Sequence, residues 1–333
     1  MLVLAAASLS AQTAPYDPAV QKIVAEISPE RIAATVKTLA GFGTRSNYSD
    51  PSQKTRGIGA ARRWIFDQFH GYSPRLEVSY DVEKKGTTDI ASIVAVLPGT
   101  TQPEKRLIVA AHYDSVNLHA TGDKAAEAPA PGADDNASGT AVVLELARVM
   151  SQYRFRKTIV FIAFGGEEIG LAGSSRYASR AKATREQIEA VFNNDIVGAN
   201  VVGIVHDDIS GNDDAGSSDG DTGNRLRVYS PDPSDSPSRR LARHIQAAAQ
   251  RYVPALKIEL ISRADRYDRE GDQVPFQKNG FAAVRLTSAS EHSGVQHTAA
   301  DTADGVSPSF TANVARVNGA AIADLANLTR NMP

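Results

Sequence analysis

Short apolar runs alternate with longer amphipathic stretches through the middle of the chain. Runs rich in β-branched and aromatic residues predict buried strands at 106–111, 158–164 and 190–196. Apolar residues at helical spacing predict helices at 137–150 and 172–182. Strands and helices that alternate in this way are typical of parallel strands covered by helices on both faces. We therefore predict an α/β fold with three layers (α/β/α) and a mixed, mostly parallel central sheet.

The same alternation continues on either side of this region. The remaining predicted elements are helices within 18–40 and at 57–69, 236–251 and 308–329, and strands at 75–82, 89–97, 226–229, 257–261 and 282–287. No internal repeat and no low-complexity linker divides the chain. We expect one domain over 13–333, with an N-terminal helical extension at about 13–73.

Composition narrows the possible functions. The 333 residues are 42% hydrophobic and 22% charged, which is ordinary for a globular protein with a sizeable core. The net charge is −2 and no run is rich in Lys or Arg, so we expect no nucleic-acid partner. Cysteine is absent, which excludes thiol catalysis, disulfides and cysteine-bound zinc. Any metal must be held by His, Asp and Glu.

The first residues suggest export. Residues 1–12 are apolar and then small, as at the end of a secretory signal, although they lack a positively charged start. We expect a signal-peptide remnant there and a bacterial periplasmic or secreted location. Membrane insertion is not expected, because no stretch approaches about 18 uninterrupted apolar residues. Nothing in the sequence indicates an oligomeric state.

Histidines and acidic residues gather where the predicted strands end and where one helix begins. The residues there are His112, Asp114, Asp134, Glu167, Glu168 and Asp195, and His297 follows later in the chain. Catalytic groups collect at the carboxyl ends of strands in α/β sheets. A single pair of adjacent acids would ordinarily be a solvated turn, and acids before a helix can simply cap it. The whole set together supplies the imidazoles and carboxylates that a two-metal hydrolytic site requires.

Each member of the set suggests a role. Asp134 lies in a Gly-rich turn and is the natural bridge between two ions. His112, Glu168, Asp195 and His297 can be the terminal ligands, and a set without sulfur suits zinc, with manganese or cobalt as substitutes. Asp114 could accept the second ring N–H of His112. Glu167, left without a metal, could act as the general base.

Five ordered stretches carry a family resemblance. They are Ala111–Ser115, Gly132–Gly139, Phe164–Ser174, Asn194–Gly198 and His297–Thr302. From about residue 90 onwards the chain resembles the co-catalytic di-zinc aminopeptidases, the bacterial leucyl aminopeptidase-like members of clan MH. Glutamate carboxypeptidase and the transferrin receptor are relatives. The resemblance implies a zinc exopeptidase fold (phosphorylase/hydrolase-like) and removal of N-terminal residues from peptides.

The same resemblance implies particular residue roles. One zinc would be held by His112, Asp134 and Asp195, and the other by Asp134, Glu168 and His297. Glu167 would be the general base, and a cis peptide would join Asp134 to Asp135. Relatives often carry Ser/Gly-Asp-His where this chain has Gly271–Gln273, and some use a tyrosine upstream of the last histidine to stabilise the oxyanion. Tyr267 is therefore a weaker candidate for a contact with substrate, and His292, close to His297 in the sequence, is another.

Other functions stay open. A carboxypeptidase would need a cationic clamp, which Arg263, Arg266 and Arg269 could supply. A glutaminyl-cyclase-like enzyme would use one zinc, and a receptor-like binding module none; the complete ligand set argues against both. The acidic loop 207–221 could bind calcium, but its spacing does not match an EF-hand and a solvated loop is the better interpretation.

Overall fold

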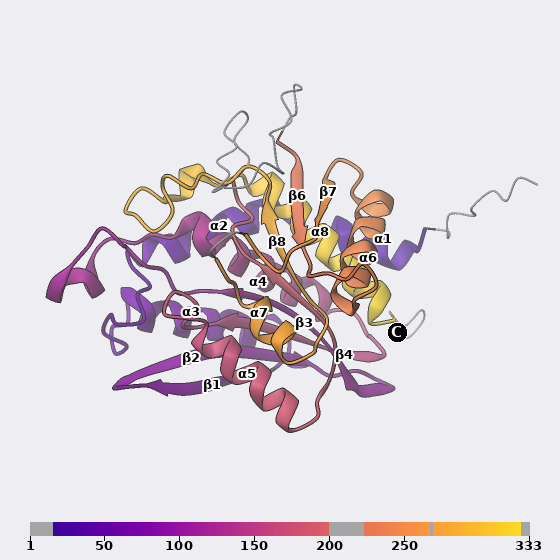
Figure 1. Ribbon diagram of the computed structural model, residues 1–333, viewed down its shortest axis with the longest axis horizontal. Coiled ribbons are helices and arrows are strands. Elements are labelled where there is room, and N and C mark those ends of the chain that lie inside the picture. The colour runs from indigo at the N-terminus through magenta and orange to yellow at the C-terminus, as the bar shows by residue number, and fades with distance from the viewer. Residues whose placement is uncertain (1–15, 200–222, 267–268, 328–333) are drawn as a thin grey trace, which may run out of the picture.

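One mixed sheet of eight strands organises the protein, in the order β1-β2-β4-β3-β5-β8-β6-β7 (Figure 1). The computed structural model describes residues 16–199, 223–266 and 269–327. The strands are β1 (Glu77–Lys85), β2 (Thr88–Leu97), β3 (Gln102–His112), β4 (Lys157–Phe164), β5 (Gln187–Asn194), β6 (Arg225–Tyr229), β7 (Lys257–Ile261) and β8 (Ala283–Ser288). The helices are α1 (Pro18–Ala25), α2 (Pro29–Gly41), α3 (Gly57–Tyr72), α4 (Gly139–Met150), α5 (Ala172–Ala183), α6 (Pro237–Tyr252), α7 (Gln273–Lys278) and α8 (Pro308–Leu325).

The centre of the sheet is parallel. Strands β4, β3, β5 and β8 pair in parallel, whereas β2 runs antiparallel to β4, and β6 antiparallel to β8. The carboxyl ends of four adjacent strands therefore meet at one edge. The predicted mixed, mostly parallel sheet is confirmed.

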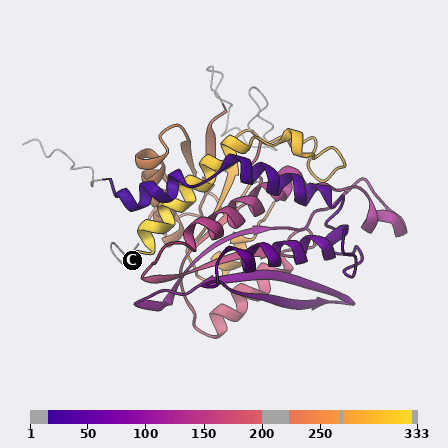
Figure 2. The ribbon, with the colours of Figure 1, turned by 180° about the vertical axis from the view of Figure 1, so that it is seen from behind.

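Alternate residues of the central strands face two separate cores, which makes three layers. In β4, Ile159 and Phe161 belong to the larger core, whereas Val160 and Ile162 belong to the smaller one. Helices α1, α2, α3, α4, α6 and α8 contribute to the larger core, and α5 and α7 to the smaller. Seen from behind, the indigo α1 and α2, the magenta α4 and the yellow α8 lie together over one face of the sheet (Figure 2).

The N-terminal helices share the larger core. Ile23, Ile32 and Leu39 are fully buried there. Helix α2 begins at Pro29 after Ser28, whose side chain caps it by accepting a hydrogen bond from the Arg31 N–H, a favourable helix start. These helices therefore help to cover one face of the sheet.

A few elements differ from the prediction. Helix α7 was not predicted, because six residues that include a proline give no readable helical period. The last helix ends at Leu325, short of the expected 329. The predicted signal remnant at 1–12 and the acidic loop 207–221 lie outside the described residues. Within the described ranges, none of the helices combines the length and the apolar character that crossing a membrane would take.

Candidate metal centre

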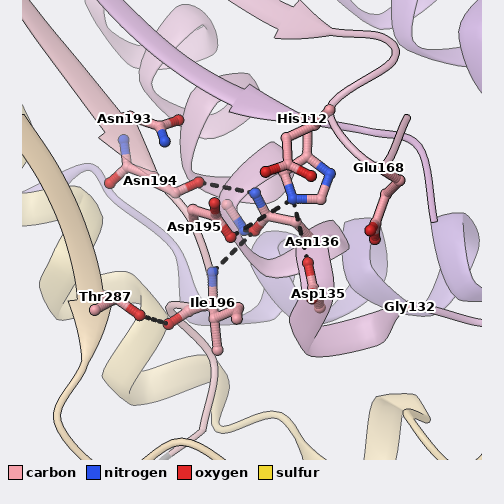
Figure 3. A network of polar contacts seen from close by, with 12 residues as sticks. His112, Gly132, Asp135, Asn136, Glu168, Asn193, Asn194, Asp195, Ile196 and Thr287 are labelled. Atoms are coloured by element: carbon pink, nitrogen blue, oxygen red, sulfur yellow. Dashed lines mark hydrogen bonds and ion pairs between the residues drawn. The ribbon is translucent and has the colours of Figure 1, made fainter. Parts of the chain in front are cut away.

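The predicted strand-end residues converge at the carboxyl edge of the sheet. His112 is the last residue of β3, Asp195 follows β5, and Glu168 lies four residues after β4 ends at Phe164. Because β4, β3 and β5 are parallel neighbours, their ends bring these side chains to one place (Figure 3). His297 reaches the same place from the loop between β8 and α8.

Asp135 lies at the middle of this cluster and faces both histidines. Its Oδ1 is 3.2 Å from His112 Nε2, and its Oδ2 is 3.0 Å from His297 Nε2. Asp195 Oδ1 lies 3.5 Å from His112 Nε2, and Glu168 Oε2 lies 3.3 Å from His297 Nε2. Three groups of three potential ligands result among the described residues, and one of them joins His112, Glu167 and Glu168. The other two share Asp135, and we call these two the ligand groups. A carboxylate that offers one oxygen to each of two groups is the arrangement expected of a bridge between two ions.

The prediction that Asp134 is the bridge is wrong. Asp134 turns away from the cluster, and its Oδ1 accepts a hydrogen bond from the Gly198 N–H at 2.8 Å. The chain is not helical at Asp135 and Asn136, so the two neighbouring acids do not point the same way. The cis peptide bond joins Asp135 to Asn136, one residue later than the resemblance implied. Sequence spacing gave no means to choose between two adjacent aspartates.

A buried aspartate holds the turn that carries Asp135. Asp301 accepts hydrogen bonds from the backbone N–H groups of Asp134 (2.9 Å) and Asp135 (3.0 Å), one at each carboxylate oxygen. The Asn136 side chain donates to the Asn194 carbonyl at 2.9 Å and so ties the turn to the end of β5 (Figure 3). Gly132, which precedes the turn, has φ +52°, and a Cβ there would lie 2.5 Å from the Asp135 carbonyl oxygen. The bridge candidate is therefore fixed by its backbone.

Asp114 holds the turn that carries the two glutamates. Its Oδ1 accepts from the Glu167 N–H at 3.3 Å, and its Oδ2 from the Glu168 N–H at 3.1 Å. The ring Nδ1 of His112 lies 3.2 Å from the backbone oxygen of Asp114 and 3.6 Å from its Oδ1. The expected contact between His112 and Asp114 is thus present, with the backbone carbonyl as the nearer acceptor. The carboxylate mainly holds the glutamate turn.

The donor set fits a pair of divalent ions. Glu168 Oε1 is buried and has no hydrogen-bond partner within the described part of the chain. Burial raises the pKa of Glu167 well above its usual range, and the carboxylates of Asp195 and Asp272 add to this shift. Burial also favours a higher pKa for Asp135, but hydrogen bonds from His112 and His297 outweigh it and lower the pKa. Crowded carboxylates and imidazoles without sulfur are a suitable environment for zinc.

The cluster opens into a pocket of about 450 Å³. Its lining includes every residue of the two ligand groups, with Glu167, Leu118, Gly170, Leu171, Arg266, Arg269 and Glu270. Leu118 and Glu270 were not predicted, because loop residues show no periodicity, and only the fold brings them to the site. Leu118 reaches it through its backbone N–H, which donates to the His297 carbonyl at 3.0 Å.

The weaker candidates for contacts with substrate do not all line the pocket. His292 is not among the pocket-lining residues of the described chain, and Tyr267 lies outside the described residues. Of the three arginines considered as a clamp, Arg266 and Arg269 line the pocket. Arg263 lies instead over the ring of Tyr229, 6.0 Å from its centroid.

Histidines and carboxylates at the carboxyl edge of a mixed sheet define a metal-binding protein of the α/β class. Residues 92–322 match the profile of peptidase family M28, and the chain belongs to that family. A protein of Pyricularia oryzae described as a probable zinc metalloprotease is 36% identical, over 96% of this chain and 68% of its own length.

Solved structures share the fold. The LapA aminopeptidase of Legionella pneumophila superposes with a TM-score of 0.71 at 19% identity, covering 94% of this chain and 75% of its own. The glutaminyl cyclase of Macrostomum lignano gives a TM-score of 0.71 at 16% identity, covering 97% of both chains. At such low identity these likenesses speak to the fold alone, and they support the three-layer α/β assignment.

Proposed function

We propose that this protein is a zinc-dependent aminopeptidase that removes N-terminal residues from peptides. The observation that carries the proposal is the position of Asp135 between His112 and His297, with Glu167 beside them in the pocket. Membership of a peptidase family and the zinc metalloprotease description of the Pyricularia oryzae relative support the reaction class. The LapA aminopeptidase is similar in fold, so the fold is compatible with action at the N-terminal end.

The ligand groups would hold two ions. His112, Asp135 and Asp195 form the group that we call the inner position, and Asp135, Glu168 and His297 form the outer position. A bound zinc pair supplies a water of lowered pKa and polarises the scissile carbonyl. Glu167 groups with His112 and Glu168 but not with the bridge candidate Asp135. We place it outside both positions, where its carboxylate would take the proton of the attacking water and pass it to the leaving amine. Asp114 keeps Glu167 in place through the backbone.

The pocket suits the end of a peptide. Besides Glu167, the lining includes Glu270, an acidic group that can bind a substrate's α-ammonium. Leu118 and Leu171 give it apolar wall that can contact the first side chain. An endopeptidase would need room for chain on both sides of the cleaved bond, and acidic groups close to the metal ligands favour an exopeptidase instead.

Carboxypeptidase action is the second candidate, because Arg266 and Arg269 also line the pocket. Arginine recognises a carboxylate in bidentate fashion. Arg266 is already paired with Glu291, whose Oε2 lies 2.6 Å from its Nη1. Glu270 is paired in turn with Lys278, at 2.9 Å, so these pairings do not separate the two candidates. A cyclase-like transferase is a third candidate on likeness of fold, but both ligand groups are complete.

We also propose export, on the apolar residues 1–12. The Pyricularia oryzae relative is fungal, so it lends no support to a bacterial periplasm in particular. Recovery of the protein from culture medium, cut close to residue 12, would support export; retention in the cell would contradict it.

The proposed function is tested by measuring zinc per chain together with hydrolysis of three substrates. These are an aminoacyl chromogenic amide, its N-acetylated form, and a peptide blocked at the N-terminus with a free carboxyl end. We expect about two zinc per chain and hydrolysis of the free-amine substrate alone, lost with a chelator and restored by zinc. Cleavage of the N-blocked peptide at its carboxyl end would instead establish a carboxypeptidase. No hydrolysis of any of them would contradict the peptidase assignment.

A further inference from the structure

We propose that Arg285 is a positioning residue for the inner metal position, which it serves by fixing the orientation of Asp195. The proposal rests on the proposed function in one respect, namely that Asp195 is a ligand. It adds that the two positions are built differently. The buried guanidinium of Arg285, next to Asp195, affects zinc affinity at the inner position alone.

The two oxygens of Asp195 face different partners. Oδ1 points to His112, 3.5 Å from Nε2, on the side of the ligand group. Oδ2 forms an ion pair with Arg285, 2.9 Å from its Nη1. Both side chains are almost fully buried, at 1% exposed for Arg285 and 3% for Asp195. With Oδ2 occupied, Asp195 offers a single oxygen to an ion.

Arg285 is itself held in place by a second aspartate, Asp265. It lies on β8, next to β5, and its Nη1 is also 3.3 Å from Asp265 Oδ2. That same oxygen accepts from Gln273 Nε2 at 2.7 Å, and Gln273 Oε1 accepts from Asn193 Nδ2 at 3.0 Å. A continuous polar chain therefore runs from β5 through the start of α7 to Arg285.

The packing around this contact is close. A Cβ on Gly271 would lie 2.8 Å from Arg285 Nη1 and 3.2 Å from Asp195 Oδ2. The absence of a side chain at Gly271 thus leaves the room in which the arginine and the ligand meet. Asp195 has little freedom to turn while Arg285 is present.

Charge and orientation act in opposite directions on a bound ion. A guanidinium next to a ligand repels a divalent cation, which would weaken binding. Asp265 on the same Nη1 offsets that charge, because Asp195, Arg285 and Asp265 alternate in sign and leave a net charge of −1. Orientation should therefore dominate, and groups that orient a ligand in this way typically contribute about 10–100-fold to metal affinity.

In the part of the chain that the structure describes, no arginine pairs with Glu168 at the outer position as Arg285 pairs with Asp195. Glu168 Oε2 faces His297, and Glu168 Oε1 has no hydrogen-bond partner among the described residues. His297 is also more open, with 24% of its side chain exposed against 1% for His112. Removing Arg285 should therefore weaken one zinc-binding step and leave the other unchanged.

The test measures zinc affinity by competition with a chromophoric chelator. Arg285→Met is made in the full chain and also together with His297→Ala, which disables the outer position and leaves the inner one to be measured alone. We expect Arg285→Met to weaken the inner step about 10–100-fold in both backgrounds, with the outer step changed less than about threefold. Arg176→Met, at an arginine that pairs with Asp81 on the surface, is the matched control and should change neither step.

Other outcomes separate the explanations. Unchanged or tighter inner binding would overturn the proposal, and an equal loss at both positions would reduce Arg285 to a structural role. If Arg285→Met does not fold, Arg285→Lys keeps the charge without the planar guanidinium, and it should weaken the inner step selectively by a smaller factor. Wild-type protein that binds fewer than about two zinc would contradict the proposed two-ion function itself, whatever the effect of Arg285.

Discussion

Two turns of this protein each carry a pair of adjacent acidic residues, and the two pairs have different roles. In both turns a buried aspartate accepts the two backbone N–H groups of the pair, Asp301 for Asp134–Asp135 and Asp114 for Glu167–Glu168. In both, the second acid joins the ligand cluster. The first acid differs: Asp134 is withdrawn to bond the Gly198 N–H, whereas Glu167 lines the pocket.

The difference shows that a similar sequence pattern acquires its role from the backbone around it. Asp134 meets a free N–H group on the segment after β5, so its carboxylate is used to hold the structure together. Glu167 lies where the pocket opens, and its charge stays close to the ligands. One pair therefore gives a structural acid and a bridge, and the other gives a candidate base and a terminal ligand.

The largest effect is expected at Glu167. Glu167→Gln keeps the size of the side chain but cannot take a proton, so kcat should fall about 10²–10⁴-fold. Zinc content should stay as in the wild type. Steady-state kinetics with an aminoacyl chromogenic amide and metal analysis of the same sample make the comparison.

Glu168→Gln is the matched variant for the other half of that pair. It should lose zinc from the outer position, and excess zinc should restore part of its activity. If added zinc restored the activity of Glu167→Gln, or if this variant turned over substrate nearly as fast as the wild type, Glu167 would not be the general base.

A smaller effect is expected where Asp114 holds the glutamate turn. Asp114→Asn replaces one accepting oxygen with a donor that faces an N–H group, which disturbs the turn and the carboxylate contact with His112. We expect a loss of about 10–100-fold in zinc affinity or in kcat/KM. Equilibrium dialysis against buffered zinc gives the first quantity. An unchanged affinity and rate would mean that the backbone carbonyl of Asp114 is sufficient by itself.

The smallest effect is expected at Asp301, and it should appear in stability first. Asp301→Asn leaves one of the two N–H groups facing an amide donor, at a cost of about 1–3 kcal/mol in the free energy of unfolding. Urea unfolding of the zinc-free protein measures it. Asp304→Asn, at an exposed residue of the same segment, should change the midpoint little. Equal effects at the two positions would show that the hydrogen bonds of Asp301 carry no special weight.

The sequence predicted well those features that depend on hydrophobic periodicity and on where strands end. Apolar runs located β3, β4 and β5, and parallel strands place their ends together, so His112, Glu168 and Asp195 were predicted to meet. His297 was predicted from one of the stretches that carry the family resemblance, and it joins the same cluster.

The sequence could not decide features that depend on the path of a single turn. Which of Asp134 and Asp135 faces the cluster depends on non-helical backbone at Asp135 and Asn136, and spacing says nothing about it. The same holds for Leu118 and Glu270, which loops bring to the pocket wall. Arg285 reads as one polar residue inside an apolar strand, and only the adjacent strand shows that it supports Asp195.

The central claim, that Asp135 rather than its neighbour joins two zinc ions, is tested most directly by zinc per chain in Asp135→Ala and Asp134→Ala. Both variants remove a buried carboxylate from the same turn, so each is a control for the other. We expect Asp135→Ala to retain less than about one zinc and to lose activity, and folded Asp134→Ala to retain about two. Full zinc in Asp135→Ala, with loss in Asp134→Ala, would contradict this account.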